Sequence, residues 1–425
     1  MKRSVLITVI MLVAAFTAAR AQSYKFDFTG AKSPKAGFTA VSPSTVFTES
    51  QGYGYDFGYA PNGNNPTFFS VNVPDGNYKV TITFGSDKDA GSTTVRGEAR
   101  RMYAMNVETK KGEEKTETFT VNKRNADING KDKVKIKDRE KTSMRWDEKL
   151  TLEFNGKAPR VKYVEIEPAS DDVITVFLCG DSTVTDNDAE PYTGWGQMLP
   201  LFFNENVAVA NYAESGLSAN SFLNQKRLEK AMTQMKKGDY VLIEFGHNDQ
   251  KQKGAGVGAY YSFAHSIKEY IDYAKQKGAK PILVTPTRRR QYDKDGKIKD
   301  THEDYPAAMR EIAAREGVVI IDFQDLTKDL IEAYSEEDSK ALFVHHPMGT
   351  FPDQEKELKD NTHFSNFGAY EISKVFCQAL ADQNHPLAKY VRQGVLPFDR
   401  KNPDKVKDFD YQMSPLIYTS KPAGN

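Results

Sequence analysis

Cysteine is almost absent from this chain, which has two in 425 residues, and its basic and acidic residues balance at 58 each. So few cysteines exclude a disulfide-rich scaffold, and the apolar surroundings of Cys179 and Cys377 favour buried free thiols. The zero net charge argues against nucleic-acid binding, because a protein that neutralises phosphates needs a surplus of basic residues. No His and Cys cluster has zinc-ligand spacing, and no glycine-rich phosphate loop follows a strand, so we expect no metal and no other cofactor.

Long apolar runs are also missing, except at the N-terminus. There Lys2 and Arg3 precede the mostly apolar run from Val5 to Ala19, and Ala19-Arg20-Ala21 has the small-x-small form of a cleavage site. This order predicts a secretory signal peptide over residues 1–21, and the run is too short to span a membrane. We therefore expect no membrane span and export to the periplasm or the cell exterior.

The length exceeds what one hydrophobic core usually serves, so we expect two domains. Residues 22–168 contain short segments of alternating polarity at roughly ten-residue spacing, which favours an all-β sandwich. The charged run from Lys131 to Lys141 reads as a solvated strand face. The candidate strands are Phe69–Val73, Tyr78–Phe84, Ala104–Glu108, Glu117–Val121, Leu150–Phe154 and Val161–Ile166.

After the polar stretch at residues 168–172 the pattern changes to continuous apolar strands alternating with helical stripes. Residues 173–179 are nearly continuously apolar, as a parallel strand buried on both faces requires, and Tyr260 to Ala274 follows helical spacing. Residues 173–425 are thus predicted to form a three-layer α/β/α domain with about five parallel strands. Right-handed crossovers then bring the loops that follow these strands to one edge of the sheet.

Polar blocks follow the predicted strands or precede the last helix, where such an edge forms a site. They are Gly180–Thr183, Asn211–Gly216, Gly246–Asp249 and Asp360–His363. Ser182 alone is weak evidence, because Gly-Asp-Ser is common in turns and helix caps. Asp360-x-x-His363 strengthens it, since a carboxylate beside one ring nitrogen leaves the other to take a proton from a serine. The alternative for this pair is a loop Asp that caps a helix next to an exposed His.

A serine nucleophile also needs donors for the oxyanion of its tetrahedral intermediate. The backbone N–H groups of Ser182 and Gly216 and the side-chain amide of Asn248 are the candidates. A loop Gly and an Asn after a strand are otherwise ordinary. The hypothesis therefore depends on all four blocks occurring in this order.

Together these blocks resemble the SGNH (GDSL-type) hydrolase superfamily, and within it the rhamnogalacturonan acetylesterases of bacterial pectin degraders. The resemblance covers about residues 173–385 and implies Ser182 as nucleophile, His363 as base, Asp360 as its partner, and Ser182, Gly216 and Asn248 as oxyanion hole. Residues 22–168 resemble galactose-binding-like sandwiches, with no motif of comparable specificity. The matching blocks are Gly180–Val184, Thr193–Gly196, Phe245–Asp249, Thr285–Arg289 and Asp360–Phe364.

Four residues are weaker candidates for substrate contacts: His247, Arg288, Arg289 and His345. His247 fits an orienting role in its loop better than a direct contact. The cluster from Arg288 to Arg290 is equally compatible with a solvated charge run and with cations for a galacturonic-acid polymer. His345 and His346 lie in a long polar stretch that could cover the site, and packing or solvent exposure is the favoured role for at least one of them.

The function predicted from these features is a secreted serine esterase that removes O-acetyl groups from pectic rhamnogalacturonan through an acetyl-enzyme. Its partner is then an acetylated pectic polysaccharide or oligosaccharide. The alternatives are an acetylesterase for xylan or peptidoglycan, and a non-catalytic glycan-binding protein. If residues 173–425 hold all the chemistry, a chain lacking residues 22–168 should still cleave a small acetate ester.

Overall fold

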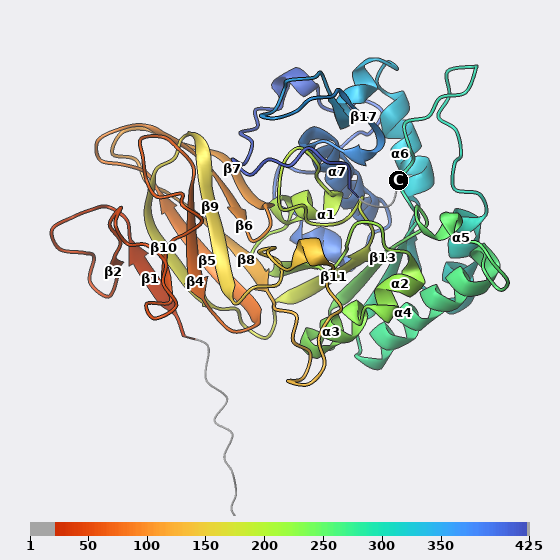
Figure 1. Cartoon of the computed structure of the whole chain (residues 1–425), viewed down its shortest axis with the longest axis horizontal. Helices are drawn as coiled ribbons and strands as arrows, with labels where there is room; N and C mark the ends of the chain where they lie inside the picture. Colours follow the sequence, from red (N-terminus) through yellow and green to blue (C-terminus); the bar gives the residue numbers. More distant parts are fainter. Residues whose placement is uncertain (1–21, 423–425) are drawn as a thin grey trace, which may run out of the picture.

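The computed structural model describes residues 22–422, so the predicted signal peptide lies outside the described residues. Within that range the strands form sheets of ten, five and two members. Figure 1 shows an all-β half beside a half in which helices flank a sheet. None of the described helices is both long and apolar enough to cross a bilayer.

The second half contains the predicted parallel sheet, with strand order β15-β14-β13-β11-β12. The three central strands, β11, β12 and β13, are buried along nearly their whole length, which explains their continuous apolar runs, whereas β14 and β15 each begin with two residues that are not fully buried. The α/β/α architecture and the five parallel strands are thus confirmed. The strands are β11 (Ile174–Gly180), β12 (Val207–Asn211), β13 (Tyr240–Glu244), β14 (Lys280–Val284) and β15 (Val319–Ile321).

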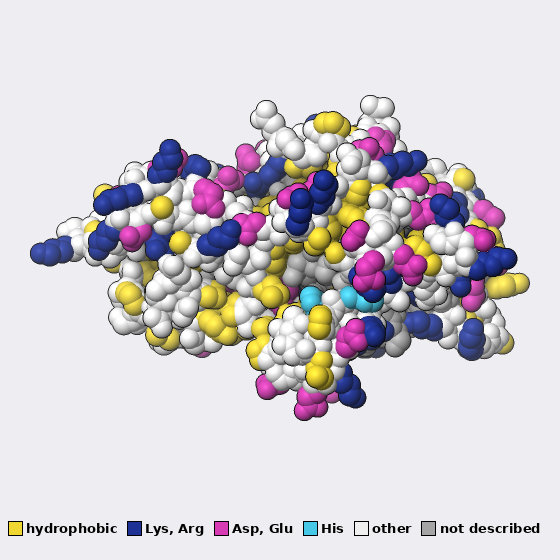
Figure 2. Space-filling model, turned by 90° about the horizontal axis from the view of Figure 1, so that it is seen from above, with side chains coloured by type: hydrophobic (Ala, Val, Ile, Leu, Met, Phe, Trp, Pro, Cys, Tyr) yellow, Lys and Arg dark blue, Asp and Glu magenta, His cyan; other side chains and the backbone are white. Residues whose placement is uncertain are grey.

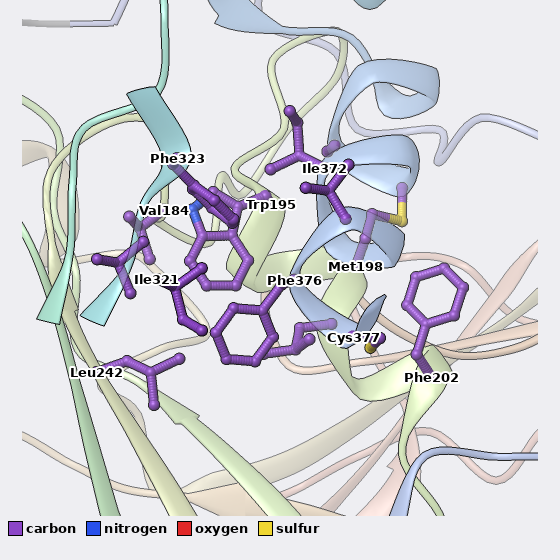
Figure 3. Packing of buried hydrophobic residues seen from close by; sticks show 14 of the residues in the cluster. Val184, Trp195, Met198, Phe202, Leu242, Ile321, Phe323, Ile372, Phe376 and Cys377 are labelled. Atoms are coloured by element: carbon purple, nitrogen blue, oxygen red, sulfur yellow. The ribbon is translucent and has the colours of Figure 1, made fainter. Parts of the chain in front are cut away.

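Helices cover both faces of this sheet because successive side chains of a strand point to opposite sides. Val176 and Leu178 of β11 join one apolar cluster, and Phe177 and Cys179 join the other. In the first cluster Trp195 lies between aromatic rings of α6 and α7 (Figure 3). Its helices are α1 (Trp195–Met198), α6 (Phe323–Glu332) and α7 (Asn366–Asp382), and those of the second are α2 (Ala219–Asn224), α3 (Arg227–Gln234), α4 (Ala264–Gln276) and α5 (Tyr305–Glu316).

The first half is a sandwich whose two sheets enclose an apolar core. Five of the six candidate strands from the sequence lie within observed strands, and Phe69–Val73 extends one residue beyond β4, whereas β1, β2, β3 and β6 were not predicted. Strand β6 was not predicted because its sequence is rich in Gly, Ser and Thr, although all its residues are buried. The strands are β1 (Tyr24–Asp27), β2 (Thr39–Ala40), β3 (Tyr53–Tyr55), β4 (Thr67–Asn72), β5 (Gly76–Phe84), β6 (Gly91–Gly97), β7 (Arg101–Thr109), β8 (Lys115–Lys123), β9 (Lys149–Ala158) and β10 (Val161–Pro168).

The two halves share a sheet, which the sequence did not indicate. Strand β8 of the sandwich pairs in parallel with β12 at Thr120–Ala208 and Val121–Val209, so the ten-stranded sheet runs through both halves. Beyond this short ladder the buried Arg101 guanidinium donates to the carbonyls of Val209 (2.8 Å) and Asn122 (2.7 Å). It therefore bridges the two strands where their own hydrogen bonds end.

The segment from residue 124 to residue 148 is packed against the second half. The predicted strand over Lys131–Lys141 is wrong, because no strand forms there and residues 138–140 form a 3₁₀ turn. Most of its lysines are exposed, as a solvated face requires, but Val134 and Glu140 are buried. Trp146 lies in the same apolar cluster as Phe177, with its ring 6.0 Å from that of Tyr212. Alternation with lysine suggested a strand, but contacts far along the chain decide the conformation.

These contacts reverse the expectation that residues 173–425 can hydrolyse a small ester without the first half. We now expect a fragment of residues 173–422 to fail to fold into an active esterase. It would expose the edge of β12 and the apolar surface under Trp146, and it would leave buried carboxylates without their arginine partners, at about 3–5 kcal/mol for each broken pair.

Circular dichroism during thermal unfolding, together with hydrolysis of a chromogenic acetate ester, tests this expectation against the chain of residues 22–422. A soluble fragment with a cooperative transition and the turnover of the longer chain would show that the second half is autonomous.

Candidate active site

Ser182, His363 and Asp360 form a continuous hydrogen-bonded series. Ser182 follows β11, and the other two lie on β17 (Leu358–Phe364), which pairs with β16 (Phe343–His346) before α7. His363 Nε2 is 2.8 Å from Ser182 Oγ, and its Nδ1 is 2.8 Å from Asp360 Oδ2. The side chains are only 2–5% exposed. The alternative of an exposed His beside a capping Asp is therefore wrong.

Asp360 is held so that one oxygen faces the imidazole. Its Oδ1 accepts the backbone N–H groups of Thr362 (2.8 Å) and His363 (3.0 Å), which leaves Oδ2 for His363 Nδ1. Burial favours the neutral acid, but the hydrogen bonds and charge of His363 and the two backbone donors outweigh it and lower the pKa of Asp360 to about 2. The carboxylate is thus ionised at neutral pH and selects the tautomer with a proton on Nδ1. Nε2 then accepts the serine proton.

Gly216 and Asn248 lie in the loops that follow β12 and β13. Gly216 has φ +78°, a conformation that suits glycine. Asn248 Nδ2 donates to Leu217 O at 3.0 Å, so the amide joins the two loops and has its second N–H for another acceptor. Glu214 N donates to Gly180 O (3.2 Å), which ties the Gly216 loop to the strand that carries Ser182.

Two buried carboxyl groups, those of Asp181 and Glu244, hold the turn that carries Ser182. Thr183 Oγ1 lies 3.0 Å from Asp181 Oδ1 and 3.1 Å from Glu244 Oε1, while Trp195 Nε1 donates to Glu244 Oε2 (2.7 Å). Burial, with the charge of Asp181 nearby, raises the pKa of Glu244 to about 8. Asp249 connects two loops, because it accepts the N–H groups of Ala219 (2.8 Å) and Gly246 (3.1 Å).

His247 is 1% exposed and faces the interior. Its Nδ1 is 3.0 Å from His302 Nε2, and its Nε2 is 3.4 Å from Thr287 Oγ1. Burial, and next the neighbouring His302, hold the pKa of His247 well below its usual value, so the ring is neutral. This placement agrees with an orienting role and offers no exposed atom for a sugar. His302, which the sequence did not single out, completes the pair.

The three arginines after β14 are 6–8% exposed, so a solvated charge run is the wrong interpretation. A substrate contact for Arg288 and Arg289 stays a prediction, and their internal bonds count against it. On the face shown in Figure 2 basic and acidic side chains are interspersed over both halves. The internal bonds run from Arg288 Nε to Gln324 O (3.0 Å), from Arg289 Nη1 to Thr301 O (3.0 Å) and from Arg290 Nε to Ser339 Oγ (2.9 Å).

His345 is half-buried on β16, and its Nε2 is 2.9 Å from Asn361 Oδ1, beside Asp360. A substrate contact for it stays a prediction. Sequence reasoning missed two nearer neighbours of the triad. The Tyr192 ring meets His363 edge-on with centroids 5.8 Å apart, and Lys421 Nζ lies 3.6 Å from Asp360 Oδ2. Neither carries a signal in sequence, since both are brought to the site by long-range folding.

A pocket of about 540 Å³ opens beside the triad. It is bordered by Tyr192, by Ser215 just before Gly216, by Arg139 and Arg145 of the sandwich half, and by Lys421 near the C-terminus. Its lining mixes charged, hydroxyl and aromatic groups, which suits a polar ligand such as a sugar. Among residues 22–422 no group of three or more His, Cys, Asp or Glu side chains is arranged to hold a metal.

Comparison with known proteins agrees with this geometry. The profile of the GDSL-like Lipase/Acylhydrolase family matches residues 178–368. Rhamnogalacturonan acetylesterase RhgT of Bacillus subtilis (strain 168) is 41% identical over 220 residues, which are 51% of this chain and 94% of that protein.

Two further matches extend over both halves. The uncharacterized esterase YxiM of the same strain is 25% identical over 393 residues, 86% of this chain and 92% of that protein. A crystal structure of YxiM from Bacillus subtilis covers 85% of this chain and 99% of its own, with 25% identity and a TM-score of 0.46. With a relative of 41% identity matched along nearly its whole length, the chain belongs to the GDSL-like lipase/acylhydrolase family and is an ester hydrolase.

Proposed function

We propose that this protein is a carbohydrate acetylesterase that removes O-acetyl groups from rhamnogalacturonan. The main support for an esterase reaction is the hydrogen-bonded series Ser182–His363–Asp360, with its two distances of 2.8 Å. The substrate is proposed from the 41% identity to RhgT, which is named a rhamnogalacturonan acetylesterase. Action outside the cytoplasm is proposed from residues 1–21 of the sequence.

In the proposed mechanism Ser182 Oγ attacks the acetyl carbonyl while His363 Nε2 takes its proton. The carbonyl oxygen becomes an oxyanion, which accepts hydrogen bonds from the N–H groups of Ser182 and Gly216 and from the Asn248 amide. His363 then gives the proton to the departing sugar oxygen, leaving an acetyl group on Ser182. Water, deprotonated by His363, releases acetate and restores the serine. Asp360, ionised throughout, stabilises the imidazolium in both halves of the reaction.

Ser182→Ala should abolish acetate release, because the alanine has no atom to attack the carbonyl and the covalent route is lost. Acetate is measured on acetylated rhamnogalacturonan and on a chromogenic acetate ester. Ser170→Ala is the matched control, since it makes the same change at an exposed position between the halves. A folded Ser182→Ala variant with the wild-type rate would refute the assignment of the nucleophile.

The substrate is tested separately by comparing acetate release from acetylated rhamnogalacturonan, xylan and peptidoglycan. We expect the highest kcat/KM on rhamnogalacturonan. A higher kcat/KM on xylan or on peptidoglycan would show that the polymer is the substrate in place of rhamnogalacturonan, and the esterase mechanism would still hold.

Asn248→Ala should lower kcat by about 10²–10³, the usual cost of one oxyanion donor, with KM nearly unchanged. The reason is that the amide interacts most strongly as charge develops on the oxygen. Steady-state kinetics on the small ester separate the two constants. A raised KM with an unaltered kcat would instead make Asn248 a substrate-binding residue.

A further inference from the structure

The peptide group between Ser215 and Gly216 is held from its carbonyl side by two cations of the sandwich half. Ser215 O accepts hydrogen bonds from Lys137 Nζ and from Arg139 Nη2, the latter at 2.8 Å. Both side chains belong to the segment of residues 124–148. This carbonyl is therefore fixed by residues that lie outside the half carrying the triad.

We propose that Lys137 and Arg139 are positioning residues that orient the Gly216 N–H in the oxyanion hole. In a trans peptide the carbonyl oxygen and the following N–H lie in one plane and point in opposite directions. Two donors that hold Ser215 O thus also fix the direction of the Gly216 N–H. Positive charge at that oxygen polarises the peptide and makes its N–H a stronger donor. The inference rests on the proposed function and extends it to the sandwich half.

The same segment fixes the residues just before this peptide. Glu214 is 1% exposed, and its Oε1 accepts Arg139 Nε (3.1 Å) while its Oε2 accepts Arg145 Nη1 (2.7 Å). Arg145 Nη1 also reaches Thr185 Oγ1 (3.1 Å), which in turn donates to Ala213 O (2.7 Å). The loop is accordingly held at Ala213, Glu214 and Ser215, and only the contact at Ser215 O acts on the peptide group that contains the Gly216 N–H.

The segment itself is anchored by other residues. Trp146 and Val134 are buried in the apolar cluster of the second half, and Trp146 Nε1 donates to the buried Glu140 (2.9 Å). The Arg139 side chain is 46% exposed, in contrast. Removal of its charge should consequently leave the segment in place and alter the peptide that it contacts.

Lys137→Met and Arg139→Gln should each lower kcat on the small ester, and the double variant should lower it by up to about 10²-fold, the lower end of the cost of one lost donor. KM should stay within about twofold of the wild type, because the ground-state carbonyl interacts weakly with the hole. Lys137→Arg should restore most of kcat, since it retains a cationic donor. Lys141→Met is the matched control, because its ammonium group lies on the exposed side beside Asp138 (2.8 Å).

The pH profile supplies a second readout. Burial lowers the pKa of Lys137 to about 8. The charges of Glu214 and Glu140 oppose this shift, whereas those of Arg139 and Arg227 add to it. The cation is present below this pH and is lost as pH rises through it. Wild-type kcat should therefore fall above about pH 8, and this limb should be absent in Lys137→Met and moved to higher pH in Lys137→Arg.

The outcomes separate the two proposals. A wild-type protein without esterase activity would overturn the proposed function itself. An active wild type whose Lys137→Met and Arg139→Gln variants keep kcat would overturn the inference alone. If Lys137→Met or Arg139→Gln unfolds in a thermal melt, the test is the alkaline limb of the pH profile in the wild type and in Lys137→Arg. Identical limbs in these two proteins would contradict the role of Lys137.

Discussion

Buried ion pairs between the two halves are the constraint on which the active-site loops depend. Arg100 Nη2 lies 2.5 Å from Glu190 Oε2, and Arg145 Nη1 lies 2.7 Å from Glu214 Oε2, with all four side chains at most 5% exposed. The arginines come from the sandwich half, and the carboxylates lie in the loops after β11 and β12. Replacing such pairs by apolar groups can be neutral, but removing one partner leaves a buried charge. Each pair therefore enforces one arrangement of the halves.

The geometry of Arg100 shows how far this constraint reaches. Its guanidinium also donates to Tyr192 O (3.1 Å) and to Asn366 Oδ1 (3.1 Å), so one side chain connects the loop beside His363 with the start of α7. Burial would raise the pKa of Glu190, but Arg100 and next Arg96 outweigh it and lower that pKa, which keeps the pair ionised. The loop beside His363 and the start of α7 are thus held by the same buried guanidinium that joins the two halves.

Sequence reasoning succeeded where a local pattern carries the information. The apolar run of β11 and the polar block after it predicted both the strand and the position of Ser182, because parallel strands place such loops at one edge. The Asp360-x-x-His363 spacing predicted a pair that the structure joins within one strand end. These features depend on neighbours a few residues away, which a periodic pattern records.

It failed where partners are distant in sequence. Arg100 and Asn366 are 266 residues apart, and nothing local distinguishes a buried arginine from an exposed one. For the same reason Lys131–Lys141 resembled a solvated strand and the cluster after β14 a surface charge run. The parallel pairing of β8 with β12 was also not predictable, since it involves only two residue pairs and gives neither strand a distinctive sequence pattern.

The comparison with RhgT gives this dependence a further meaning. The match covers 94% of that protein and only 51% of this chain, so nearly all of RhgT corresponds to about half of this chain's length. In the chain described here, the edge of β12 and the carboxylate of Glu214 are both completed by the sandwich half. The added half is thus integrated into the catalytic framework, because its removal would expose a strand edge and a buried charge at once.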